Sequence, residues 1–191
     1  MKLRFYLFVG LLLFARGCDF YSTSLWIFKP GGLEMETNPL VRYLGFGWSG
    51  LLISNLIIVV LILMAYHYYL FRYRPRRPVE DLRNYRENVS YLYFGRKDRW
   101  YWMCYRLPKN KRASLAHLGY VLFWALVVGS FLATFHNFSQ YYNLAFYDTF
   151  REWVGRPLYV LYGLIAVTVV CCYRQLLHRE YRMLYPPSES S

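Results

Sequence analysis

Arg16, Asp19 and Thr23 place two charges and a hydroxyl at spacings of three and four residues in a stretch that is otherwise mostly apolar. At 100° per residue they fall within an arc of about 60° on a helix, so the guanidinium and the carboxylate can pair along one face. Either charge costs about 2.5 to 3.5 kcal/mol near the centre of a membrane, so this face must turn toward protein or water. We expect either an ion pair that fixes helix packing or a site for a substrate, proton or ion.

Other polar side chains are predicted at a similar depth in neighbouring helices. Counting 1.5 Å per residue from the outer helix ends puts Asp19, Asn55, Ser130 and Tyr162 about 9 to 14 Å below the surface. Together they predict one polar layer across the bundle. The alternative is a set of ordinary interhelical hydrogen bonds, which contribute about 0.6 kcal/mol each in membrane proteins.

The segment after the first helix carries two further polar residues, Glu36 and Asn38. Asn38 followed by Pro39 predicts a helix that begins at Pro39 with Asn38 as its cap. We expect this short helix to run through Leu44 and to bend at residues 45–47 into the next long helix. Glu36 would then lie at the positive end of the short helix, where the helix dipole alone favours a carboxylate.

Asp19, Glu36 and His136 could supply carboxylates and an imidazole for a metal ion or for general acid and base catalysis. A histidine in the place of His136 more often anchors a helix end. The sequence has no spaced Cys and His set, no Ser, His and Asp nucleophile arrangement, no phosphate-binding glycine loop and no H-E-x-x-H motif. We therefore predict no metal and no cofactor, and an intramembrane enzyme ranks last among the possible functions.

Long uncharged runs define the helices that must position these residues. No Asp, Glu, Lys or Arg occurs over residues 43–71, 113–147 and 157–173. Each run is long enough, or nearly so, for a helix of about 20 residues to cross roughly 30 Å of hydrocarbon. The transmembrane helices predicted from these runs cover about residues 48–71, 114–136 and 156–176.

The first segment, about residues 4–28, is interpreted as one more transmembrane helix. The alternative is a lipoprotein signal in which residues 5–15 form the apolar region and Cys18 is acylated after cleavage. Arg16, next to the cut, argues against cleavage, and the apolar pattern continues to Phe28. We favour the uncleaved helix.

Composition excludes several classes of protein. Of the 191 residues, 57% are hydrophobic and 21% aromatic, which excludes a disordered chain, and only 4 are Cys, which excludes a disulfide-rich module. The excess of Lys and Arg gives a net charge of +12 and falls on the N-terminus, the loop 72–113 and the residues after Tyr173, which include the tail 177–191. By the positive-inside rule these parts face the cytoplasm. The prediction is a single all-α membrane domain, a bundle of four transmembrane helices with both termini inside, in the inner membrane of a bacterium.

The cytoplasmic loop between the second and third transmembrane helices mixes aromatic and basic residues. Beside two membrane helices, this mixture favours the headgroup zone, with rings at the interface and cations on anionic lipid phosphates. The alternative is stacking on nucleobases, and a nucleic-acid partner is not expected. The predicted headgroup contacts are Arg74, Arg76, Arg77, Arg96, Lys97, Arg99, Trp100 and Trp102.

Residues 19–39 also carry a motif. Asp19-Phe20-Tyr21-Ser22-Thr23, then Gly32 and Glu36-x-Asn38-Pro39, resembles the D-x-x-[ST]-T … G … E-x-N-P pattern of a prokaryotic family of small polytopic membrane proteins with no assigned function. The resemblance covers about residues 15–60 and does not extend to the basic loop or the last two helices. It implies that Asp19, Thr23, Glu36 and Asn38 belong to one constellation, and it implies no activity.

The lack of a catalytic signature favours a non-catalytic membrane protein, either an accessory or structural subunit of a larger complex or a homo-oligomer. The alternative is a small transporter or ion-translocating unit that uses Arg16 and Asp19 as a relay. The expected partners are the bilayer with anionic headgroups on its cytoplasmic face, other membrane subunits, or further copies of the chain. The candidate intramembrane polar site consists of Arg16, Asp19, Thr23, Glu36, Asn38, Asn55 and His136.

Overall fold

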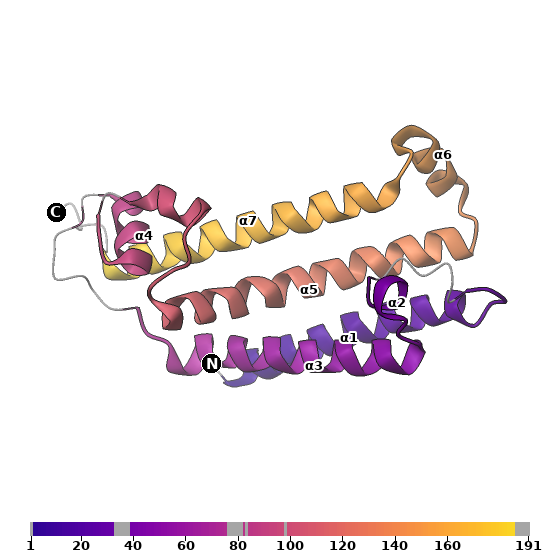
Figure 1. Cartoon of the computed structure of the whole chain (residues 1–191), viewed down its shortest axis with the longest axis horizontal. Coiled ribbons are helices and arrows are strands. Elements are labelled where there is room, and N and C mark those ends of the chain that lie inside the picture. Colours follow the sequence, from indigo (N-terminus) through magenta and orange to yellow (C-terminus); the bar gives the residue numbers. More distant parts are fainter. Residues whose placement is uncertain (1, 33–38, 76–81, 83, 98, 186–191) are drawn as a thin grey trace. The chain divides into compact units, whose positions relative to one another are not determined.

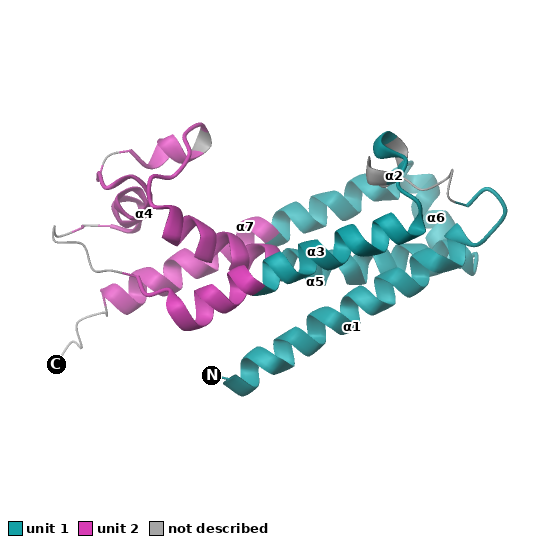
Figure 2. Ribbon diagram, turned by 60° about the horizontal axis from the view of Figure 1, so that its bottom comes forward, with its two compact units in different colours: residues 1–63, 123–168 teal, residues 64–122, 169–191 magenta. Residues whose placement is uncertain are grey.

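A computed structural model of the chain describes residues 2–32, 39–75, 82, 84–97 and 99–185, and these residues form helices joined by turns (Figure 1). The chain divides into two compact units, coloured separately in Figure 2. Unit 1 contains residues 1–63 and 123–168, and unit 2 contains residues 64–122 and 169–191. Three of the helices contribute residues to both units.

Three helices are long and apolar enough to cross a membrane, which indicates a membrane protein. They are α3 (Trp48–His67), which continues as a π-helical turn over Tyr68–Arg72, α5 (Lys111–Tyr141) and α7 (Pro157–Leu184). A fourth long helix, α1 (Lys2–Ile27), has 26 residues and so a length of about 39 Å. Arg16, Asp19 and several hydroxyl-bearing residues make α1 less apolar than the other three.

The predicted helix ranges agree with these elements except where polar residues continue a helix beyond its apolar run. α5 begins at Lys111, where the Asn110 side chain accepts a hydrogen bond from the backbone N–H of Ala113 (3.2 Å) and so caps the first turn. It extends past the predicted end at 136 to Tyr141. α7 continues to Leu184, so the predicted tail 177–191 is helical over much of its length.

Short helices occupy the connections. α2 (Pro39–Leu44) begins at Pro39, as predicted, and is followed by Gly45 at φ 65°. In the predicted cytoplasmic loop, α4 (Tyr85–Phe94) is capped by the Asn84 side chain and ends at Gly95 at φ 70°, and a 3-10 helix follows over Trp100–Cys104.

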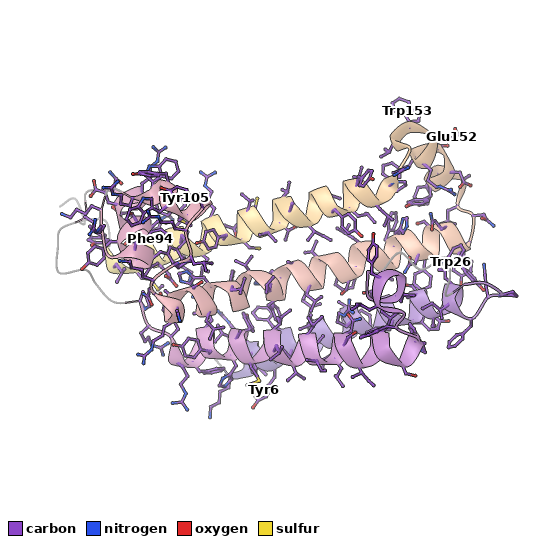
Figure 3. All side chains as sticks on the ribbon, in the orientation of Figure 1. Tyr6, Trp26, Phe94, Tyr105, Glu152 and Trp153 are labelled. Carbon is purple, nitrogen blue, oxygen red and sulfur yellow. The ribbon has the colours of Figure 1, made fainter. Side chains whose placement is uncertain are left out.

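α6 (Ala145–Val154) was not predicted, because it lies between two transmembrane runs and its sequence has no clear start signal. It is amphipathic: Tyr147 is buried, whereas the side chain of Trp153, labelled in Figure 3, is 88% exposed. An amphipathic helix of this kind can lie along a membrane surface.

α5 provides the central packing surface of each unit. In unit 1 its Ser130 contacts Arg16 of α1, and its Gly129 faces Ile165 of α7. In unit 2 its Gly119 packs on the backbone of Ala65 in α3, and its His117 bonds to Glu180 of α7. Small residues on α5 therefore allow close helix contact, and polar residues on α5 join the helices by hydrogen bonds.

A substitution at Gly119 tests how much the close approach of α3 and α5 contributes to the stability of the protein. A Cβ added at Gly119 would lie 2.7 Å from the Cβ of Ala65, which is too close without a shift of the backbone. We expect Gly119→Leu to lower the free energy of unfolding by about 1 to 3 kcal/mol through overpacking. Unfolding by SDS in mixed micelles, followed by circular dichroism, measures the change.

Gly163→Leu is the matched control, because Gly163 also lies within a long helix and an added Cβ would meet nothing within 4 Å. Its free energy of unfolding should stay close to that of the unaltered protein. An equal loss of unfolding free energy in the two variants would show that the close contact between Gly119 and Ala65 does not determine the effect.

Candidate functional site

Arg16 is the centre of an interhelical polar network in unit 1. Its guanidinium forms an ion pair with Asp19, one turn further along α1, as the spacing of the two residues predicts. Nη2 donates to Oδ1 of Asn55 on α3 (2.6 Å), and Nη1 donates to Oγ of Ser130 on α5 (3.1 Å). Asn55 and Ser130, two members of the predicted polar layer, thus meet at Arg16. One charged side chain ties together three helices.

The Arg16 guanidinium is largely buried and already engaged by other groups of the protein. Its side chain is 11% exposed and that of Asp19 is 14% exposed. The guanidinium carbon lies 4.7 Å from the centre of the Phe20 ring, in cation–π contact. Nε is buried and has no hydrogen-bond partner among the residues that the structure describes. A ligand at the terminal nitrogens would therefore have to compete with Asp19, Asn55 and Ser130.

Thr23 belongs to a separate cluster at the next turns of α1. Asn137 of α5 donates from Nδ2 to the hydroxyl oxygens of Ser22 (3.2 Å) and Thr23 (3.1 Å). Trp26, labelled in Figure 3, donates from Nε1 to the backbone carbonyl of Asn137 (3.2 Å). The amide of Asn137 thus holds α1 against α5.

A cavity of about 760 Å³ lies beside these clusters within unit 1, and we name it the Arg16 cavity. Its size is within the range of about 300 to 1,000 Å³ that is typical of small-ligand pockets. Residues of α1, α3, α5, α6 and α7 contribute to its wall. Its polar and aromatic lining includes Arg16, Asp19, Thr23, Trp26, Lys29, Trp48, Asn55, His136, Asn137, Gln140, Arg151, Arg156, Tyr159 and Tyr162.

The Arg16 cavity carries an excess of positive charge. Of the lining residues that the structure describes, four are Lys or Arg and one, Asp19, is acidic. Asp19 is paired with Arg16, so Lys29, Arg151 and Arg156 are left without a carboxylate in the wall. Lys29 Nζ lies 4.4 Å from the Trp26 ring centre and 4.2 Å from that of Tyr141, and Arg156 donates to the Tyr159 hydroxyl (3.2 Å). These contacts hold Lys29 and Arg156 in place without neutralising them, whereas Arg151 forms an exposed ion pair with Asp148, which does not line the cavity.

His136 lines the same cavity but is engaged elsewhere. Its Nδ1 contacts the hydroxyl of Tyr147 on α6, and both side chains are buried. Burial raises the pKa of the Tyr147 phenol, so this hydroxyl stays protonated and can donate to the ring nitrogen. His136 thus joins α6 to α5 from within α5, rather than at the helix end.

Part of the predicted site lies outside the described residues. Glu36 and Asn38 fall there, so their place relative to Asp19 and Thr23 remains a prediction. Over the ranges that the structure does describe, no group of three or more His, Cys, Asp or Glu could hold a metal ion.

A second polar network, in unit 2, was missed by sequence reasoning. Glu180 of α7 is 2% exposed and His117 of α5 is 1% exposed. Nε2 of His117 lies 3.0 Å from both carboxylate oxygens of Glu180, and its Nδ1 contacts the Tyr93 hydroxyl of α4. Tyr73 donates to Oε2 of Glu180 over 3.5 Å.

The phenols of this network serve as hydrogen-bond donors. Burial, followed by the influence of neighbouring groups that include Glu180, raises the pKa of both Tyr73 and Tyr93 far above the usual range. Because a carboxylate only accepts hydrogen bonds, His117 presents a proton on Nε2 and an acceptor on Nδ1 when neutral. These donors thus satisfy the hydrogen-bonding capacity of the deeply buried Glu180 carboxylate.

The predicted headgroup residues differ in exposure. Trp102 is 9% exposed, packs edge-on against Phe94 and is in cation–π contact with Arg99 and Arg106, so it belongs to the interior of unit 2. Figure 3 labels Phe94 in this region. The described residues that remain accessible to a lipid surface are Arg74, Arg96, Lys97, Arg99 and Trp100, whereas Arg76 and Arg77 lie outside the described residues.

Comparisons with protein families, with curated proteins and with solved structures find no match for this chain.

The Arg16–Asp19 pair allows a direct test of its structural role. Arg16→Gln and Asp19→Asn are each expected to lower the free energy of unfolding by about 3 kcal/mol, because each leaves the other charge unpaired in a largely buried setting. The double variant should recover most of this loss. SDS-induced unfolding of the four proteins gives the coupling energy directly.

Arg151 and Asp148 provide the control pair, since they have the same spacing but are 51% and 52% exposed with an N–O distance of 3.7 Å. Arg151→Gln and Asp148→Asn should change the free energy of unfolding by less than about 1 kcal/mol. Simple additivity of Arg16→Gln and Asp19→Asn would contradict the interpretation of that pair as a packing constraint.

Proposed function

We propose that this chain is an integral membrane protein with four transmembrane helices, α1, α3, α5 and α7, in the inner membrane of a bacterium. Three of these helices are apolar enough to span a membrane, and α1 has sufficient length. The pairing of Arg16 with Asp19, Asn55 and Ser130 supports the fourth span, since it keeps the charged face of α1 against protein instead of lipid.

Charge supports an orientation with both termini inside. Residues 72–112 contain 13 Lys or Arg and 4 Asp or Glu, whereas the opposite connections, 29–42 and 148–156, carry equal numbers of positive and negative residues. In this orientation Lys29, Arg151 and Arg156 lie toward the outer side. The Arg16 cavity then faces away from the cytoplasm.

The proposed activity is non-catalytic binding of an anion in the Arg16 cavity, in a protein that works as a subunit of a membrane assembly or as a homo-oligomer. The observation that carries this proposal is the set of three cations, Lys29, Arg151 and Arg156, in a wall whose one described carboxylate is already paired. Such a set attracts phosphate or carboxylate groups, and the surrounding aromatic rings and amides can orient them.

A transporter is the second candidate, because the Arg16–Asp19 pair itself forms part of the cavity wall. An anion that displaced Asp19 from Arg16 would reach the interior of the bundle. Four helices are few for a complete translocation path, so this function would require further copies or other subunits.

The orientation predicts which cysteines react from outside. In a variant with Cys18, Cys104, Cys171 and Cys172 replaced by Ser, Trp153→Cys should react with a membrane-impermeant maleimide in intact cells. Leu107→Cys should react only after the membrane is opened. Both native side chains are highly exposed, at 88% and 92%, so access to the reagent and not burial decides the result. The reverse pattern would overturn the proposed orientation.

Anion binding is tested by calorimetric titration of the purified protein, in a non-ionic detergent, with inorganic phosphate. The unaltered protein should bind, and Arg151→Gln/Arg156→Gln should weaken binding by about tenfold or more because two charge-assisted contacts are lost. Lys2→Gln/Arg4→Gln makes the same change of charge on α1 at residues that do not line the cavity. Absence of phosphate binding, or equal loss in both double variants, would remove the basis of the proposal.

A further inference from the structure

A second cavity, of about 560 Å³, lies within unit 2 between α4, the 3-10 helix, α5 and α7. We name it the Trp100 cavity. Most of its wall is apolar, and much of this apolar surface comes from segments of α5 and α7 that belong to membrane-spanning helices. The aliphatic lining residues are Val89, Leu118, Val121, Val169, Val170 and Leu177.

The charged groups at the Trp100 cavity are all positive. Arg86 of α4 and Arg174 of α7 line it, and no Asp or Glu occurs among the lining residues that the structure describes. The Arg86 guanidinium carbon lies 5.5 Å from the centre of the Trp100 ring, which is 49% exposed. Both arginines are exposed side chains, so they can meet an anion at the mouth of the cavity.

Two buried polar residues of the wall already have hydrogen-bond partners. Tyr93 and His117 line the cavity, but they bond to each other, and His117 also bonds to Glu180. They therefore offer ring surfaces to an occupant instead of free donors and acceptors. An apolar interior with two cations at its edge matches an amphiphile that has an aliphatic chain and an anionic head.

We propose that the Trp100 cavity binds one anionic phospholipid of the cytoplasmic leaflet. One acyl chain lies along the valines of α5 and α7, and the phosphate lies at Arg86 and Arg174. This inference rests on the proposed membrane placement, in which α4 and Trp100 lie at the headgroup level and Val121 and Val170 within the hydrocarbon. Tryptophan and arginine are suited to that interface, where cations attract anionic lipids.

The test uses the full chain reconstituted into vesicles of phosphatidylcholine and phosphatidylglycerol at a ratio of about 4 to 1 and then extracted in a mild non-ionic detergent. Native mass spectrometry counts the lipids that remain on each chain. We expect one retained phosphatidylglycerol per chain. Arg86→Gln/Arg174→Gln should reduce the preference for phosphatidylglycerol over phosphatidylcholine by about tenfold or more.

A steric variant tests the chain site independently of charge. Val121→Trp should fill the cavity and abolish retention of phosphatidylglycerol. Leu122→Trp is the matched control, because Leu122 is the next residue of α5, is 37% exposed and does not line the cavity. Arg179→Gln/Arg182→Gln is the matched control for charge, since both arginines lie on α7 outside the cavity.

Equal retention of the two lipids by the unaltered protein overturns the proposal, as does full retention of phosphatidylglycerol by Val121→Trp. So does a loss in the control variants as large as in the cavity variants. Arg151→Gln/Arg156→Gln should retain phosphatidylglycerol normally, because those residues line the Arg16 cavity. Failure of phosphate binding therefore leaves the lipid result intact, and failure of lipid retention leaves the phosphate result intact.

Discussion

A guanidinium on a helix that lies among apolar helices has to find its partners within the protein, and this constraint organises unit 1. Arg16 cannot lose its charge as a lysine or histidine can, so its neighbours must supply acceptors. They do so from three elements: Asp19 on α1, Asn55 on α3 and Ser130 on α5. The rotation of α1 about its axis is thereby fixed, and Trp26 and Lys29 are carried to the wall of the Arg16 cavity.

Unit 2 buries a carboxylate instead of a guanidinium, and neutral hydrogen-bond donors stabilise it. Glu180 receives hydrogen bonds from His117 and Tyr73, and Tyr93 supports the imidazole from its other side. None of these three partners needs to carry a charge, so no Lys or Arg side chain is used to pair with Glu180 in this network. Arg86 and Arg174 remain available at the Trp100 cavity. In both units α5 contributes a residue to the network, Ser130 in one and His117 in the other.

Sequence reasoning predicted the parts of this fold that depend on helix periodicity and depth. The Arg16–Asp19 pair follows from spacing, and Asn55 and Ser130 follow from counting inward from helix ends, because uncharged runs mark those ends well. The network around Glu180 could not be found in this way. The predicted helix ended at 176, where the apolar run stops, so Glu180 was assigned to a tail. α7 in fact continues to Leu184, and it brings Glu180 to a histidine 63 residues away.

The polarity and charge of the residues lining each cavity, more than its volume, determine which kind of ligand it can bind. The Arg16 cavity presents amides, rings and three cations, and the one acidic residue among its described lining residues, Asp19, is paired with Arg16. A compact anion can therefore exchange its water for many polar partners there. The Trp100 cavity has cations at Arg86 and Arg174 but an interior of aliphatic side chains. A compact anion placed there would lose its hydration for too few partners, at a high desolvation cost. An occupant that brings its own apolar chain avoids that cost, because only its charged head needs to meet the arginines.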